Sequence, residues 1–80
     1  MSGYQEHGPI DGVVVRWSDE EGWGAIASPE LEDQIFAHYS KVQVDGYKSL
    51  RVGQPVSLTY ETPDFLQDGY PHRALSVQPR

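Results

Sequence analysis

The stretch Gly22-Trp23-Gly24-Ala25-Ile26, followed soon afterwards by Ile35-Phe36-Ala37-His38-Tyr39, decides the fold. Both are short runs of apolar and aromatic residues bounded by Gly, Asp, Ser and Pro, a composition typical of β-strands. Because side chains alternate across a strand, Trp23 and Ala25 share one face while Ile26 lies on the other. Two adjacent strands of this kind would display aromatic rings on one face of a sheet.

In the rest of the chain, short apolar runs are likewise bounded by Gly, Asp, Ser and Pro. Apolar residues never recur at helical spacing over a length that would form a helix. The pattern therefore predicts an all-β fold. We expect strands at about Gly12–Ser18, Gly22–Ser28, Gln34–His38, Pro55–Glu61 and Arg73–Gln78, one short helical turn near Tyr39–Val42, and a long loop at Thr62–His72. Closure of the five short strands into a barrel would remove their exposed edges.

The chain has 80 residues, enough for one domain with one core. Residues 1–10 are expected to be a disordered tail, because Gly3, Gly8 and Pro9 interrupt any strand pairing there. Residues 11–80 are expected to form the folded domain. Asp19-Glu20-Glu21-Gly22 predicts a tight turn between the first two strands, in which Gly22 takes a positive φ angle.

Composition excludes several classes of site. The chain has no cysteine, which excludes disulfides and thiolate metal sites. His7, His38 and His72 lie in separate segments without ligand spacing, so neither a metal nor another cofactor is expected. The longest aliphatic run, Val13-Val14-Val15, is too short to span a membrane, and a soluble cytoplasmic protein is the expectation. No nucleophile elbow, phosphate loop or pair of tuned carboxylates is present, so an enzyme is not expected.

The charge balance points away from polyanions. Six Lys and Arg residues against twelve Asp and Glu residues give a formal net charge of −6, which repels nucleic acid at long range. The acids are grouped in two predicted turns, Asp19-Glu20-Glu21 and Glu30-Leu31-Glu32-Asp33. Solvated loops that keep a small protein soluble are the simplest interpretation of these groups.

The order of the segments resembles the cold-shock domain from about Asp11 to Gln78. The resemblance rests on Gly12-Val13-Val14-Val15-Arg16-Trp17-Ser18, on the two ring-bearing stretches quoted first, and on Asp45-Gly46-Tyr47-Lys48-Ser49-Leu50 and Val52-Gly53-Gln54-Pro55-Val56-Ser57-Leu58. It implies a five-stranded antiparallel Greek-key β-barrel of the OB type, without enzymatic activity. It also implies a monomer that binds single-stranded RNA or DNA, pyrimidine-rich in our expectation, as an RNA chaperone or a regulator of transcription or translation.

The resemblance also assigns residues. The family's base-stacking positions fall on Arg16, Trp17, Trp23, Ala25, Phe36, His38, Tyr39 and Tyr47, and Lys48, Arg51 and Arg73 are candidate phosphate contacts. Four positions depart from the family: Arg16 replaces a Trp, Ala25 replaces a Phe, and Val15 and Glu21 replace lysines. Each stacked base contributes about 1–3 kcal/mol, so two missing rings predict binding weaker by about 2–6 kcal/mol. The Arg16 guanidinium, which also stacks on bases, would recover part of this loss.

Alternation predicts which rings face the solvent. We expect Ile26, Ile35 and Ala37 to be buried and Trp23, Phe36 and His38 to be exposed, with the glycines that flank Trp23 leaving room for a flat ligand. The alternative is that Trp23 and Phe36 fill the barrel. Phe65 and Tyr70 in the long loop either extend the ring surface or hold the loop on the barrel, and the sequence does not separate these two interpretations.

Two other functions remain open. A barrel of this type that has lost its affinity for nucleic acid would bind a protein partner through the same ring face, and the acidic loops would suit a basic partner. Ala25, Glu21 and Val15 favour this alternative, whereas Trp23, Phe36, His38 and Tyr47 favour the binding of bases. The second possibility is a structural module within a larger complex.

Overall fold

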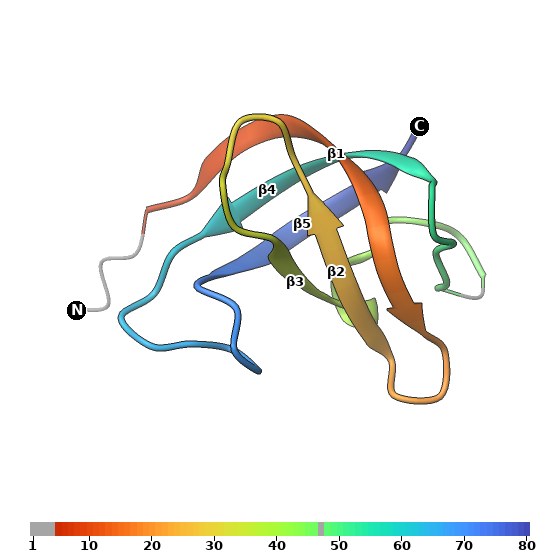
Figure 1. Ribbon diagram of the computed structural model, residues 1–80. Coiled ribbons are helices and arrows are strands. Elements are labelled where there is room, and N and C mark those ends of the chain that lie inside the picture. The colour runs from red at the N-terminus through yellow and green to blue at the C-terminus, as the bar shows by residue number, and fades with distance from the viewer. Residues whose placement is uncertain (1–4, 47) are drawn as a thin grey trace.

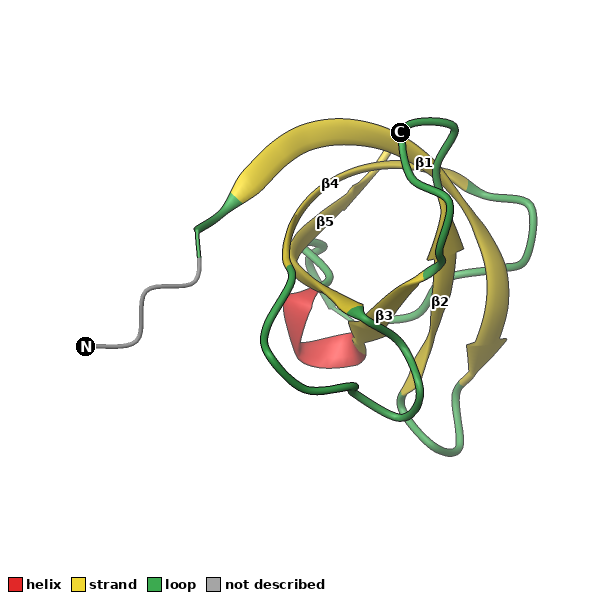
Figure 2. Cartoon of the chain, turned by 60° about the vertical axis from the view of Figure 1, so that its left-hand side comes forward, coloured by secondary structure: helices red, strands yellow, loops and turns green. Residues whose placement is uncertain are grey.

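The computed structural model describes residues 5–46 and 48–80, which form a closed five-stranded barrel (Figures 1 and 2). The strands are β1 (His7–Ser18), β2 (Trp23–Ala27), β3 (Ile35–His38), β4 (Pro55–Glu61) and β5 (His72–Pro79), and the 3₁₀ helix η1 (Tyr39–Lys41) follows β3. Their order around the barrel is β1-β2-β3-β5-β4. The predicted all-β barrel is confirmed. No helix among the described residues is long and apolar enough to cross a membrane.

The barrel closes through one parallel pairing, which the expected antiparallel barrel did not include. Strand β3 runs parallel to β5, with Ile35 opposite His72 and Phe36 opposite Arg73. The other neighbouring pairs, β1–β2, β2–β3, β1–β4 and β4–β5, are antiparallel. The parallel contact is possible because β4, which follows β3 in the sequence, pairs with β1 and leaves the edge of β3 to β5.

Strand β1 begins at His7, not at Gly12, so the predicted disordered tail is wrong for its last residues. His7 and Ile10 pair with Tyr60 and Leu58 of β4, and the register shifts between these two pairs. Pro9 lies within that shift, where its missing N–H costs no regular ladder bond. The sequence pattern at Gly8 and Pro9 predicts a break, whereas a strand paired on one edge tolerates both residues.

The barrel interior is filled by aliphatic side chains from every strand and from the β3–β4 connection. The cluster consists of Val14, Ile26, Ile35, Ala37, Val42, Leu50, Val56, Leu58, Ala74 and Val77. The predicted burial of Ile26, Ile35 and Ala37 is confirmed, since all three are 0% exposed. Their alternation fixes the opposite, outer face of β2 and β3.

The turn between β1 and β2 takes the predicted form. Gly22 has a φ angle of +80°, and its N–H donates to the Ser18 carbonyl at 2.8 Å. This tight connection sets the β1–β2 register, in which Ser18 lies opposite Trp23 and Trp17 opposite Gly24. The turn thereby places the β1 side chains next to the ring-bearing face of β2.

Candidate nucleic-acid interface

One row of side chains crosses the outer face of all five strands. Arg16 of β1 lies opposite Ala25 of β2, and Ala25 lies opposite Phe36 of β3. Phe36 lies opposite Arg73 of β5, which in turn lies opposite Glu61 of β4. Because directly opposed residues project to the same side of a sheet, these five form a continuous outer row. The row places a ring between two guanidinium groups.

Three rings gather beside this row, and we call Trp23, Phe36 and Tyr70 the ring cluster. The centroid of the Trp23 ring lies 5.0 Å from that of Phe36 and 6.1 Å from that of Tyr70, and the Phe36 and Tyr70 centroids are 6.4 Å apart. These are ordinary separations for interacting aromatic side chains. The cluster packs on the outside of the barrel, so the alternative in which Trp23 and Phe36 fill the core is excluded by the core composition.

Phe36 is less accessible than the sequence predicts. Its exposed fraction is 7%, whereas Trp23 is half-buried. The predicted exposure of Phe36 is therefore wrong, although its outward direction is right. Rings from a neighbouring strand and from the β4–β5 loop cover it. Alternation within a strand specifies the face of a residue, but it cannot predict that a distant loop returns to that face.

Tyr70 is the ring that the sequence pattern does not place. A tight reversal holds it: Tyr70 and Gln67 exchange two backbone hydrogen bonds of 2.9 Å, with Asp68 and Gly69 between them at φ angles of 51° and 88°. Two consecutive positive φ angles favour Gly and Asp. Tyr70 therefore extends the ring surface and holds the loop on the barrel at the same time, so both interpretations of this residue apply.

Arg16 occupies the place where the family has a Trp, and it lies against the ring cluster. Its guanidinium carbon is 4.8 Å from the Trp23 ring centroid, a cation–π geometry. Ala25, next to it in the row, is 0% exposed. An aromatic ring at position 25, where the family has a Phe, would have to displace Arg16 or Phe36. The small Ala25 side chain therefore leaves no open gap in the row.

The glycines that flank Trp23 accept rings from the protein itself. A Cβ atom on Gly24 would lie 2.0 Å from the Arg16 carbonyl oxygen and 2.7 Å from Cε3 of Trp17, and one on Gly22 would lie 3.1 Å from Cδ1 of Tyr39. The predicted room for a flat ligand at these glycines is therefore filled. Trp17 packs against the core, whereas Tyr39 is 46% exposed.

Trp17 and Tyr39 form the aromatic sides of a surface hollow of about 220 Å³, which we call the acidic pocket. Its other lining residues are Asp19, Glu20, Glu21, Gly22 and Lys48. The Asp19 carboxylate accepts hydrogen bonds from Ser49 Oγ at 2.7 Å and from Trp17 Nε1 at 2.8 Å. These two bonds stabilise the ionised form and lower the pKa of Asp19. The pocket thus combines rings with fixed negative charge.

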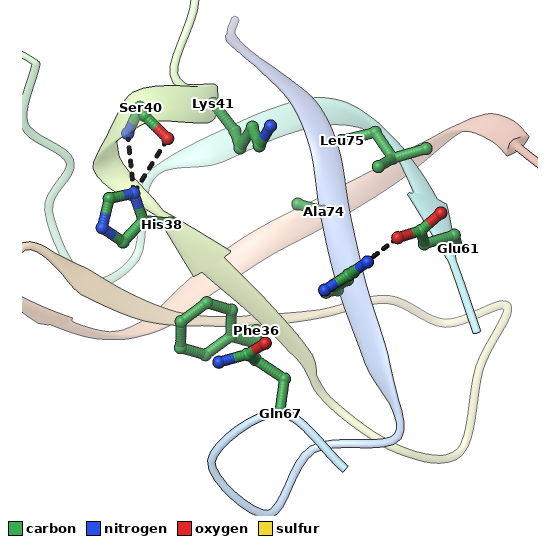
Figure 3. A pocket seen from close by; sticks show the side chains of 9 residues that line it. Phe36, His38, Ser40, Lys41, Glu61, Gln67, Ala74 and Leu75 are labelled. Carbon is green, nitrogen blue, oxygen red and sulfur yellow. Dashed lines mark hydrogen bonds and ion pairs between the residues drawn. The ribbon is translucent and has the colours of Figure 1, made fainter. Parts of the chain in front are cut away.

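His38 lies at the end of β3 and caps η1. The Ser40 N–H donates to His38 Nδ1 at 3.3 Å, and Ser40 Oγ lies 2.8 Å from the same nitrogen (Figure 3). An accepting Nδ1 leaves the proton of a neutral imidazole on Nε2, where it can be donated. The His38 ring also lies 4.7 Å from that of Tyr39, centroid to centroid. His38 therefore connects the acidic pocket with the next hollow.

That hollow, the Arg73 pocket, has a volume of about 370 Å³ and lies over β3 and β5 (Figure 3). It is lined by Phe36, His38, Ser40, Lys41, Glu61, Gln67, Arg73, Ala74 and Leu75. Of these, only Phe36, His38 and Arg73 were predicted as site residues. Strand alternation could have found Glu61, because it occupies the end of β4 on the outward face.

The other predicted residues are not brought to the ring cluster. Lys48 lines the acidic pocket, and Arg51 lines a separate hollow with Arg80. Tyr47 lies outside the described residues. Within residues 5–46 and 48–80, no group of three potential metal-ligating side chains is found.

Comparison with known proteins agrees with this geometry. A family model described as the 'Cold-shock' DNA-binding domain matches residues 10–69. The chain is 49% identical over 51 residues to the cold shock-like protein CspD of Vibrio cholerae, covering 62% of this chain and 66% of that one. It is 40% identical over 52 residues to the major cold shock protein CspA of Bacillus cereus, covering 65% of this chain and 76% of that one.

The chain belongs to the cold-shock DNA-binding domain family. This is a family of binding domains and not of enzymes. In the CspD proteins of Haemophilus influenzae and Vibrio cholerae, the matched segment spans 62% and 66% of the relative's length, just under two thirds.

Proposed function

We propose that this domain binds single-stranded nucleic acid through the ring cluster, His38 and Tyr39. The observation that carries the proposal is an aromatic cluster held outside the barrel core, with Arg16 over one ring and Arg73 next to another in the outer row. Unpaired bases stack on such rings, and cations beside them contact the phosphates. Lys41, on the rim of the Arg73 pocket, adds a third cation.

The finer features of the binding belong to the same proposal. Pyrimidine-rich strands are the proposed targets, because small bases fit beside rings that are partly covered. The affinity is proposed to be lower than that of family members that carry aromatic rings at the positions of both Arg16 and Ala25. Ala25 is buried, and Glu21 adds negative charge to the turn. We further propose that the protein is a monomeric, cytoplasmic RNA chaperone or a regulator of transcription or translation.

A titration of fluorescein-labelled oligo-thymidine and oligo-adenosine, read by anisotropy at two salt concentrations, tests this function. Wild-type protein should bind oligo-thymidine, and Trp23→Ala should weaken binding by about fivefold or more, the lower end of one lost stack. Val52→Ala is the matched control, because Val52 is 67% exposed and lies outside the ring cluster, the acidic pocket and the Arg73 pocket. Absence of binding by wild-type protein at the lower salt concentration would refute the proposal.

The acidic pocket favours a second candidate function, the binding of a basic protein segment. Trp17 and Tyr39 provide ring faces for a lysine or arginine side chain, and Asp19, Glu20 and Glu21 provide the opposite charge. A titration with an arginine-rich peptide distinguishes the two candidates. Binding that is lost in Glu20→Gln combined with Glu21→Gln, while oligo-thymidine does not bind, would support the protein-interaction function.

A further inference from the structure

We infer that the Arg73 pocket selects a guanine base, held at its Watson–Crick edge by Arg73 and Glu61. This inference rests on the proposed binding of single strands and adds a base-reading site to it. The pocket is separate from the Trp23 ring and lies on the β5 side of Phe36. Its volume of about 370 Å³ is within the range of roughly 300–1,000 Å³ that is usual for small-molecule sites.

The charged pair in the pocket is held rigidly. Arg73 Nε donates to Glu61 Oε2 at 2.5 Å, and the Arg73 guanidinium carbon lies 5.2 Å from the Phe65 ring centroid. The ion pair fixes one edge of the guanidinium, and the ring of the β4–β5 loop supports one of its faces. Among the described residues, the Nη atoms of Arg73 have no hydrogen-bond partner, so their donors remain for a ligand.

Glu61 is unusual for the outer face of a small barrel. Its side chain is only 11% exposed, compared with 34% for that of Arg73. A buried ion pair contributes little net stability, because desolvation offsets the attraction between the charges. Glu61 lines the pocket, and its Oε1 atom and the remaining lone pairs of Oε2 have no hydrogen-bond partner among the described residues. A ligand with hydrogen-bond donors would satisfy them.

Guanine fits this arrangement better than the other bases. Its Watson–Crick edge presents one acceptor, O6, followed by two adjacent donors, N1–H and the N2 amino group. An arginine Nη donor next to a carboxylate with two acceptor atoms complements this order, and reading an unpaired base at that edge is common in single-strand recognition. Uracil and thymine have only one donor on their Watson–Crick edge. In adenine and cytosine, the amino group is a donor where guanine has the O6 acceptor, and the ring nitrogen beside it is an acceptor where guanine has the N1–H donor.

The rim of the pocket suits the phosphate attached to such a nucleotide. Lys41 and His38 both line the pocket, and the Lys41 ammonium group has no ion pair among the described residues. Glu61 is already paired with Arg73, so its charge does not stand alone against a phosphate. The ring cluster at the neighbouring position would stack the preceding or following base.

A substitution scan tests the site. One thymidine of a short oligo-thymidine is replaced by deoxyguanosine or by 7-deazadeoxyguanosine, at each position in turn, and affinity is measured by anisotropy. At one position, both replacements should raise the affinity of the wild-type protein by at least about fivefold, the lower end for one bidentate base contact. The 7-deaza base should behave like guanine, because the proposed contacts do not involve N7.

Glu61→Gln should remove this gain, measured relative to the variant's own affinity for oligo-thymidine, since its amide would present N–H groups to the guanine donors. Glu32→Gln makes the same charge change in the exposed β2–β3 loop and should keep the gain. If the protein binds oligo-thymidine but no position shows a gain, the inferred guanine site is overturned and the proposed function stands. A gain that survives in Glu61→Gln would overturn it as well, and failure of every oligonucleotide to bind would overturn both this site and the proposed function.

Discussion

Trp23 and Phe36 project from neighbouring strands to the same outer face, but they contribute differently to the molecule. Trp23 is half-buried and Phe36 is 7% exposed. Removal of a buried Phe ring costs about 3–5 kcal/mol in protein cores, and less where solvent can enter the space. Phe36→Ala should therefore lower the free energy of unfolding by about 3 kcal/mol as well as weaken binding.

Trp23→Ala should weaken binding with a much smaller loss of stability. Urea denaturation of both variants, combined with an oligo-thymidine titration, checks the contrast. Equal destabilisation by the two substitutions would mean that Trp23 is as important to the packing as Phe36.

Asp19 connects local hydrogen bonding with stability at acid pH. Its pKa is lowered by hydrogen bonds from Ser49 and Trp17, so the folded state favours the carboxylate. The resulting stabilisation is present above the ordinary pKa of Asp, about 3.9, and is lost as the pH falls through the lower pKa of the folded state. Asp19→Asn should lose less stability than wild-type protein between about pH 6 and pH 2.

Urea denaturation across this range measures the difference. Asp33→Asn, in the exposed β2–β3 loop, controls for the removal of one negative charge. An identical pH profile for wild-type protein and Asp19→Asn would contradict the proposed stabilisation of the carboxylate.

Among the elements, the β4–β5 loop contributes most to the ring cluster beyond the strands. The reversal at Asp68 and Gly69 presents Tyr70 to Trp23 and Phe36. Gly69 has a φ angle of +88°, and a Cβ atom added there would have no neighbour within 4 Å, so Gly69→Ala adds backbone strain without a clash. The strain is worth about 1–2 kcal/mol. It should loosen the reversal and weaken oligo-thymidine binding.

Gly53→Ala is the matched control. Gly53 has a φ angle of +93°, and a Cβ atom there would also have no neighbour within 4 Å. The substitution should cost similar stability and leave binding unchanged, because it lies in the turn before β4. Equal effects of the two variants on binding would show that the position of Tyr70 does not matter.

The sequence predicts the strands well and the site only in part. Strand β4 has the predicted bounds, and the faces of Ile26, Ile35 and Ala37 are correct, because alternation and turn residues are local properties. The parallel closure of β3 on β5 and the covering of Phe36 are non-local. They depend on where distant segments meet, and a single sequence does not specify such contacts.

At the scale of the whole molecule, the net charge of −6 is unevenly distributed. Arg16, Lys41 and Arg73 line or border the ring cluster and the Arg73 pocket, whereas most of the acids lie in turns and loops. Three cations in contact with a single strand give an expected slope of about −2 for log affinity against log salt, at about 0.7 for each phosphate. Binding should therefore depend only moderately on salt.

Glu21→Lys tests the effect of the acidic turn. It should raise the affinity for oligo-thymidine and steepen the slope by about 0.7, because it removes a repelling carboxylate and adds one phosphate contact. Glu32→Lys changes the net charge equally, but Glu32 lies in the β2–β3 loop, at the opposite end of β2 from Glu21. It should change the slope little. A similar response of the two variants would mean that only the overall charge matters.

The attachment of Tyr70 to a loop has a thermal consequence. A ring carried by a central strand keeps its place until the whole barrel unfolds, whereas a surface reversal opens locally at a lower free energy. On warming, Tyr70 should therefore leave Trp23 and Phe36 while β1 to β5 remain paired. The domain would then hold single strands less tightly at temperatures below its melting transition, because part of the ring surface depends on the order of residues 62–71 and not on the stability of the barrel.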